Sequence, residues 1–174
     1  MGTAAVSLIG FLVVLITAFT ALADVVGLNE LAGSSLTAAQ SAAVRKVDSR
    51  VRAVSATVSG ADVDIVIENR GRLKYAEPGF SDWEVIVRYQ DSGGTERIEY
   101  ISYASVLASG KWTVQQIYLD EPNLTAEIYE PGILNDDEEM VIRARLSNAP
   151  GPGTTNLVTV APPEGGEAQI FFSG

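Results

Sequence analysis

The sequence predicts an α+β protein: a long N-terminal hydrophobic α-helix followed by an antiparallel, immunoglobulin-like β-sandwich. Residues 1–23 contain no charged side chain. Apolar residues then recur at three- and four-residue spacing to about residue 54, which is the period of an amphipathic helix. From residue 55 the pattern becomes alternating, with turn residues between the apolar runs. We therefore expect a helical domain over 1–54 and a sandwich over 55–174.

The first 23 residues form an uninterrupted apolar segment. As a helix they would extend about 35 Å, enough to cross a bilayer core of about 30 Å. A helix that is apolar on every side must be buried in lipid or among other chains. Hydropathy does not separate a membrane anchor from a helix packed in a bundle of identical helices, because both surroundings exclude water. A secretory signal peptide fits less well, since no Lys or Arg precedes Arg45.

A helix from about residue 2 to about residue 54 would be about 80 Å long, more than an anchor needs. That length suits a long helix packed alongside neighbouring copies of the same helix. The basic cluster at 45–52 either is a solvated turn or meets the acidic C-terminal part of a neighbouring copy. The candidate subunit-interface residues are the large apolar side chains of the first segment: Leu8, Ile9, Phe11, Leu12, Val13, Leu15, Ile16, Phe19 and Leu22.

Eight segments after residue 55 have the composition and spacing of strands, separated by Gly, Pro, Asn and Asp turns. Seven or eight short antiparallel strands at this spacing are typical of a sandwich. The predicted strands are Ala56–Ser59, Val63–Glu68, Trp83–Gln90, Arg97–Tyr103, Thr113–Leu119, Met140–Leu146, Leu157–Val160 and Ala168–Phe172.

The segment Asp91-Ser92-Gly93-Gly94 predicts a hairpin between the third and fourth of these strands. Aromatic residues such as Trp112 and Tyr118 are expected to pack in the core or in an interface. Ile86 indicates that the outer face of its strand is partly covered. We expect one face of the strand to carry Trp83, Val85, Val87 and Tyr89, and the other Glu84, Ile86 and Arg88.

Composition argues against several kinds of function. The net charge of −10 disfavours binding to nucleic acid phosphates, and residues 53–174 hold nineteen acidic groups against eight basic ones. The chain has no His and no Cys, so the commonest general base and every thiol nucleophile are missing. We predict no enzyme activity, no catalytic residue, no cofactor and no small-molecule substrate.

Two sequence features remain as candidate sites. The run Asp136-Asp137-Glu138-Glu139 could help to bind calcium together with Asp120, Glu121 or Glu127, but it lacks the spacing of a calcium loop and also fits a solvated cap before a strand. Asn123-Leu124-Thr125 is a glycosylation sequon, so Asn123 is a possible modification site.

The N-terminal stretch Gly2-Thr3-Ala4-Ala5-Val6-Ser7-Leu8-Ile9-Gly10-Phe11-Leu12-Val13-Val14 resembles the start of a mature archaellin, the subunit of the archaeal motility filament. Archaellins belong to the type IV pilin-like superfamily, and Ala5 stands where bacterial pilins usually carry Glu. The resemblance implies an extracellular helical homopolymer, inserted in the membrane before assembly. It also implies a leader peptidase, an assembly ATPase and a membrane platform as partners.

A second resemblance supports an alternative. The segments Val63-Asp-Ile-Val-Ile-Glu-Asn-Arg-Gly and Trp83-Glu-Val-Ile-Val-Arg-Tyr are also similar to archaellum accessory proteins, which combine an anchor with a sandwich and act as stator-like envelope proteins. An adhesive type IV pilin anchored by the same helix is a further possibility.

Overall fold

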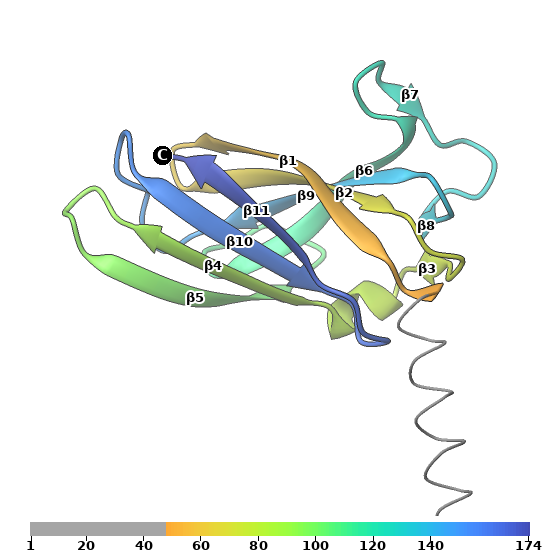
Figure 1. The fold of residues 1–174 in the computed structure, drawn as a ribbon, viewed down its shortest axis with the longest axis horizontal. Helices are drawn as coiled ribbons and strands as arrows, with labels where there is room; N and C mark the ends of the chain where they lie inside the picture. The colour runs from red at the N-terminus through yellow and green to blue at the C-terminus, as the bar shows by residue number, and fades with distance from the viewer. Residues whose placement is uncertain (1–47) are drawn as a thin grey trace, which may run out of the picture. The chain divides into compact units, whose positions relative to one another are not determined.

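Alternating apolar residues build strands throughout residues 48–174, the part of the chain that the computed structural model describes (Figure 1). Every predicted strand coincides with a long observed one. The long strands are β1 (Val51–Ser59), β2 (Asp62–Asn69), β4 (Glu84–Gln90), β5 (Glu96–Tyr103), β6 (Lys111–Asp120), β9 (Glu139–Arg145), β10 (Thr155–Ala161) and β11 (Ala168–Ser173). The short elements are β3 (Tyr75–Ala76), a 3-10 turn η1 (Gly79–Asp82), β7 (Thr125–Ala126) and β8 (Ile133–Leu134).

The long strands form one continuous sheet in the order β1-β2-β9-β6-β5-β4-β10-β11, with β7 paired to β6 and a separate β3-β8 pair. All neighbours are antiparallel except β5 and β6, which run parallel through Ser102↔Lys111 and Tyr103↔Trp112. The first strand, β1, lies beside the last, β11, so the sheet curls into a barrel-like shape (Figure 1).

The predicted α+β class is wrong for the described residues, which are nearly all β. The predicted antiparallel immunoglobulin-like sandwich is also wrong, because the parallel β5-β6 pairing joins all the long strands into one sheet. Residues 1–47 of the predicted helix, with all its interface candidates, lie outside the described residues. Residues 51–54 belong to β1, which pairs with β2 from Val51↔Asn69 onward. The division at residue 54 stays a prediction.

Val47, Val51 and Val54 follow helical spacing, but Val51 also opens an alternating run. Pairing with β2 satisfies the backbone groups of that run, and this tertiary contact overrides the local helical pattern. Over the described range 48–174, no helix has the length and apolar character needed to span a membrane.

The inward-facing side chains of all the long strands meet in a single apolar core. Valine and isoleucine dominate it, as expected for half-buried strands. The fully buried members with the largest volumes include Trp112, Tyr89, Ile65, Ile67, Ile101, Met140 and Ile142. The prediction that Trp112 packs in the core is confirmed, while Tyr118 is half-buried.

The central strand β4 confirms the predicted alternation. Trp83, Val85, Val87 and Tyr89 are buried, whereas Glu84 and Arg88 are exposed and Ile86 is half-buried. The predicted hairpin is also present. Asp91 Oδ1 accepts from the backbone N–H of Gly93 and of Thr95, both at 2.9 Å, and thereby organises the turn.

Two charged pairs connect β2 to β9 on the outer face of the sheet. Arg145 donates to Asp62 through Nε at 2.7 Å and Nη2 at 2.9 Å. Arg143 donates to Asp64 through Nε at 2.6 Å and Nη2 at 2.7 Å. Each pair lies directly across the two strands, so it supports the observed register. The hydrogen bond from Arg145 lowers the pKa of Asp62 below its ordinary value of 3.8.

The core position Ile67 provides the first test. In a protein comprising residues 48–174, Ile67→Ala removes buried methyl groups and leaves a cavity, so we expect a loss of about 2–5 kcal/mol in unfolding free energy. The matched control Ile98→Ala changes a side chain that is 70 % exposed, and should alter stability by less than about 0.5 kcal/mol. Urea denaturation measures both. Equal losses would contradict the described core.

The second test concerns pH. A lowered folded-state pKa means that the Asp62–Arg145 pair stabilises the fold above the unfolded pKa of Asp62, near 3.8, and that this stability is lost as pH falls through the folded pKa. Asp62→Asn should therefore cost about 1 kcal/mol or less at pH 7, and the cost should shrink as the pH falls through the folded pKa of Asp62. Thermal unfolding across this range measures the difference. Asp136→Asn, at an exposed position, is the control, and a pH-independent cost would contradict the pairing.

Candidate functional site

The segment 118–139 leaves the sheet at the end of β6 and returns at the start of β9 (Figure 1). We call it the acidic projection. It contains no Lys or Arg and holds eight of the 22 acidic residues of the chain: Asp120, Glu121, Glu127, Glu130, Asp136, Asp137, Glu138 and Glu139. It therefore carries most of the net charge of −10.

Carboxylates of the projection hold its own backbone in place. Asp120 accepts from the backbone N–H of Asn123 at 3.2 Å and from its side-chain Nδ2 at 2.7 Å, which organises the turn after β6. Glu127 Oε1 accepts from the backbone N–H groups of Tyr129 and Glu130. These carboxylates satisfy peptide groups in the turns on either side of the short strand β7, so the projection keeps a defined shape although little of it is paired in a sheet.

The densest acidic run divides into two exposed and two more buried residues. Asp136 and Asp137 are exposed. Glu138 is 6 % exposed and accepts from the backbone N–H of Asn135 at 2.7 Å. Glu139 accepts from the backbone N–H of Glu121 at 2.8 Å. Within residues 48–174, no three His, Cys, Asp or Glu side chains gather closely enough to hold a metal ion. Calcium binding by this run stays a prediction without a formed cluster.

Two carboxyl groups of the projection have shifted pKa values with opposite causes. Burial raises the pKa of Glu138 above its ordinary value of 4.5, and the neighbouring Glu127 adds to the rise. The ammonium group of Lys74, 2.8 Å from Glu130, lowers the pKa of Glu130. Burial thus disfavours the charged form of Glu138, whereas the ion pair with Lys74 favours the charged form of Glu130.

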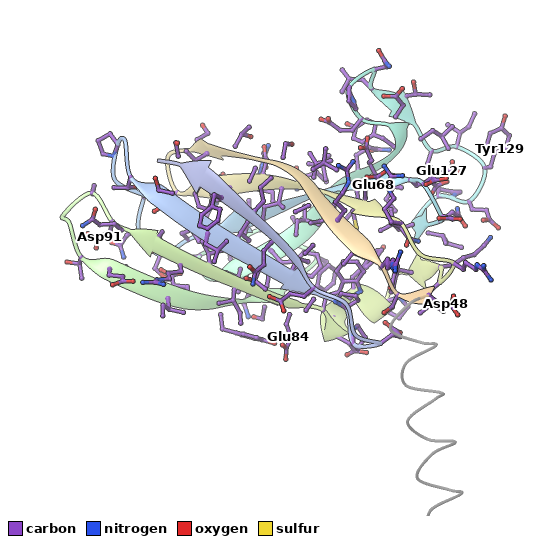
Figure 2. The ribbon with its side chains drawn as sticks, in the orientation of Figure 1. Asp48, Glu68, Glu84, Asp91, Glu127 and Tyr129 are labelled. Carbon is purple, nitrogen blue, oxygen red and sulfur yellow. The ribbon has the colours of Figure 1, made fainter. Side chains whose placement is uncertain are left out.

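Large apolar side chains on the projection point into solvent. Leu124 is 68 % exposed, Ile128 73 % and Tyr129 81 %. Figure 2 shows Tyr129 at the outer edge of the projection, directed away from the sheet. The sequence pattern did not single out these residues, because isolated apolar residues in a loop have no periodicity. The signal that could have identified them is their position between acidic and turn residues. Such a segment lies at the surface, so its apolar side chains are not buried in the core.

A group of cationic side chains lies at the base of the projection. We call it the basic patch, and it consists of Arg50, Arg52, Arg70, Arg72 and Lys74. Three of its members are connected. The backbone N–H of Arg70 donates to the carbonyl of Arg50 at 2.7 Å, and both Arg52 and Arg70 donate to the buried carboxylate of Glu68.

Two ion pairs connect the basic patch to the projection of the same chain. Lys74 lies 2.8 Å from Glu130, and Arg70 lies 3.8 Å from Asp137. Arg72 is exposed and forms no hydrogen bond or ion pair with another residue of the described range. The patch is thus only partly neutralised by the described residues.

The sequon residue Asn123 lies in the exposed turn after β6, and its side-chain amide is held by Asp120 at 2.7 Å. A glycan on Asn123 would replace one hydrogen atom of that amide. Its modification stays a prediction.

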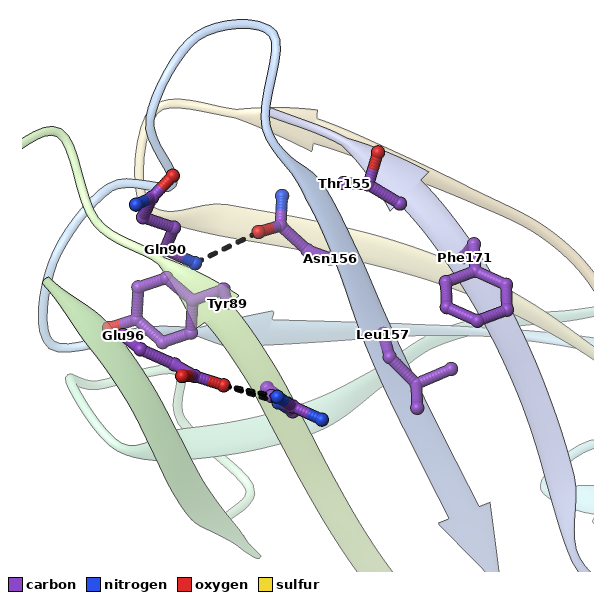
Figure 3. Close-up of a pocket in the computed structure, with 8 residues that line it drawn as sticks. Tyr89, Gln90, Glu96, Thr155, Asn156, Leu157 and Phe171 are labelled. Carbon is purple, nitrogen blue, oxygen red and sulfur yellow. Dashed lines mark hydrogen bonds and ion pairs between the residues drawn. The ribbon is translucent and has the colours of Figure 1, made fainter. Parts of the chain in front are cut away.

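The surface has an open depression of about 370 Å³ on the outer face of β4, β10 and β5 (Figure 3). Its polar groups are engaged with each other. Arg88 donates to Glu96 at 2.6 Å, and the backbone N–H of Gln90 donates to Asn156 at 3.0 Å. The charged groups of the depression are thus engaged with each other and not directed at a ligand. The acidic projection and the basic patch are the most distinctive surfaces of residues 48–174.

Three solved proteins with a similar fold are archaellum components. The crystal structure of archaeal flagellin FlaB1 from Methanocaldococcus jannaschii matches with a TM-score of 0.52 at 14 % identity, covering 71 % of this chain and 88 % of that chain. The archaellum periplasmic stator protein FlaG from Sulfolobus acidocaldarius matches with a TM-score of 0.50 at 16 % identity, covering 71 % and 98 %. A chain from the periplasmic FlaF–FlaG stator complex of the same organism matches with a TM-score of 0.51 at 16 % identity. The match covers 71 % of this chain and 88 % of that chain.

No protein-family model and no curated protein matches the sequence. At 14 to 16 % identity these likenesses establish the fold. The resemblance to an archaellin that the N-terminal residues suggested is thus confirmed for the fold: the described part of the chain has the fold shared by archaeal flagellin and the archaellum stator protein FlaG.

Proposed function

We propose that the protein is a structural subunit of an archaellum-type filament, polymerising through its N-terminal apolar segment. The observation that carries the proposal is the combination of a fold shared with archaeal flagellin and 23 leading residues without a charge. An outer domain of this fold attached to an apolar segment is the plan that the resemblance to archaellins implies.

The energetics of the apolar segment support polymerisation. Burying one Leu, Ile, Val or Phe side chain contributes about 1.5–3 kcal/mol relative to water. The segment contains a dozen or so such groups, so its release into water is prohibitive. Relative to lipid this advantage disappears, and extraction from the membrane into a filament core therefore needs an external energy source. We propose that the subunit is held in the membrane first, and that an assembly ATPase, a membrane platform and a leader peptidase act on it.

The charge of the described residues suits an extracellular outer surface. A strongly acidic surface keeps crowded copies soluble and discourages unspecific association. The chain also lacks His and Cys, and the charged side chains of the depression on β4, Arg88 and Glu96, pair with each other. These features favour a structural, non-enzymatic role at the cell surface.

An archaellum stator-like envelope protein is the second candidate. The observation that favours it is the likeness to FlaG, whose TM-score of 0.50 is close to the 0.52 for flagellin. The fold alone does not separate the two functions. Copy number does, because a filament subunit is needed in large excess over a protein that acts only at the base of the filament. Adhesion by a pilin of the same plan would also give filaments, without rotation.

Electron microscopy of purified surface appendages tests the proposal. If the protein is the subunit, it is the major component of long filaments, and its density repeats along a helical lattice. If it is a stator-like protein, it fractionates with the cell envelope at low copy number and is missing from sheared filaments. The second result would overturn the proposed function.

Substitutions in the apolar segment give a sharper prediction. Leu12→Asp or Leu15→Lys places a charge where we expect a water-free environment, so filaments should be lost while residues 48–174 still fold. Leu12→Ile is the matched control and should assemble normally. Electron microscopy of appendages and circular dichroism of the purified protein measure the two properties. Normal filaments from both charged variants would count strongly against polymerisation through this segment.

A further inference from the structure

We propose that the acidic projection of one copy docks on the basic patch of a second copy of this chain. The inference deepens the proposed filament function and rests on it. It assigns a role to two surfaces, residues 118–139 and the group Arg50, Arg52, Arg70, Arg72 and Lys74, that the apolar N-terminal segment does not explain.

Charge complementarity indicates that the projection binds a second copy of the same chain. The projection has eight acids and no base, while residues 45–74 hold seven of the 12 basic residues of the whole chain. Two of the four acids in that range, Asp62 and Asp64, are already paired with Arg145 and Arg143. A chain that carries a strongly negative surface and a cationic surface at different positions is complementary to its own copies.

The contacts within one chain leave both surfaces incompletely neutralised. Only Lys74–Glu130 and Arg70–Asp137 connect them among the described residues, and the second distance is a long 3.8 Å. Arg50 and Arg72 are exposed on the patch, and Asp136 is exposed on the projection. These side chains are available to a second copy without breaking an ion pair seen in the first.

The exposed apolar side chains of the projection add a hydrophobic component to the electrostatic contact. Ile128 and Tyr129 are among the most exposed large apolar side chains of the described residues. Interfaces commonly combine a central aromatic anchor with a charged rim, because the anchor supplies affinity and the rim supplies orientation. The projection offers both kinds of group, since Tyr129 is followed by the exposed Glu130 and the same segment carries the exposed Asp136 and Asp137.

The projection is also shaped before it binds. Glu127 holds the backbone of Tyr129 and Glu130, and Glu138 holds that of Asn135. A preorganised loop loses less conformational entropy on docking than a flexible one. Because the projection and the patch are different surfaces, their contact can repeat from copy to copy, as a helical filament requires.

Cysteine crosslinking in the full-length protein tests the contact, since the chain has no Cys of its own. Ile128→Cys and Ala76→Cys, at an exposed position two residues after Lys74, are placed in separate chains that are expressed together. Oxidation can then join 128 to 76 only between copies. Mass spectrometry of the linked peptides identifies the bond.

The control partner is Ser109→Cys, an exposed position in the connection between β5 and β6. That connection lies at the end of β9 near Arg145, where β2 begins, whereas the patch lies where β2 ends. We expect the yield of 128–76 links to exceed that of 128–109 links by about tenfold or more. Equal yields, or links from 128 only to a different protein, would overturn the inference.

Charge reversal makes the test specific. Asp136→Lys or Arg72→Glu alone should lower the 128–76 yield about tenfold, because like charges then face each other. When Asp136→Lys and Arg72→Glu are combined in every copy, the yield should recover. Glu84→Lys, an exposed acid on β4, is the control and should leave the yield unchanged. No loss from either single reversal would overturn the inference.

Electron microscopy of the same samples separates the two proposals. Filaments without 128–76 links would refute the docking contact and leave the filament function intact. Links without filaments would support the contact and refute the filament function.

Discussion

The structure depends on the requirement that each long strand bury one face in a shared core. Strand residues point alternately to opposite sides, so eight strands with alternating apolar residues create a sheet with one apolar face. A flat sheet would leave that face in water. Curling until β1 lies beside β11 covers it with its own strands, and Val63, Trp112 and Val158 meet in the interior although they are far apart in the sequence.

The outer face and the loops are consequently available for charge. On β2 and β9, acids and arginines pair across the strands and support the register. On the acidic projection, carboxylates instead hold backbone N–H groups, and opposite charges are scarce. Acidic residues thus stabilise the fold through ion pairs on β2, whereas on the acidic projection they leave an unbalanced negative charge. This asymmetry motivates the proposal that copies of the chain contact each other there.

Local pattern sufficed for the long strands and for the hairpin at Asp91, because alternation and turn residues act within a few positions. It failed for β3, β7 and β8, since two residues cannot show a period. It also failed at residues 51–54, where the spacing of the valines fits a helix and a strand equally well. The acidic run at 136–139 was recognised, but the burial of Glu138 depends on partner amides that only the fold brings close.

The sequence by itself determined which residues alternate, where the chain turns and how the charge is distributed, because these properties depend on neighbours along the chain. Only the tertiary structure decided that the strands form one curled sheet, through the parallel contact of Tyr103 and Trp112. It also decided that Tyr129 stays in solvent and that Arg70 and Arg52 share Glu68. Such pairings join residues distant in sequence, and their free energy exists only once the whole core has formed.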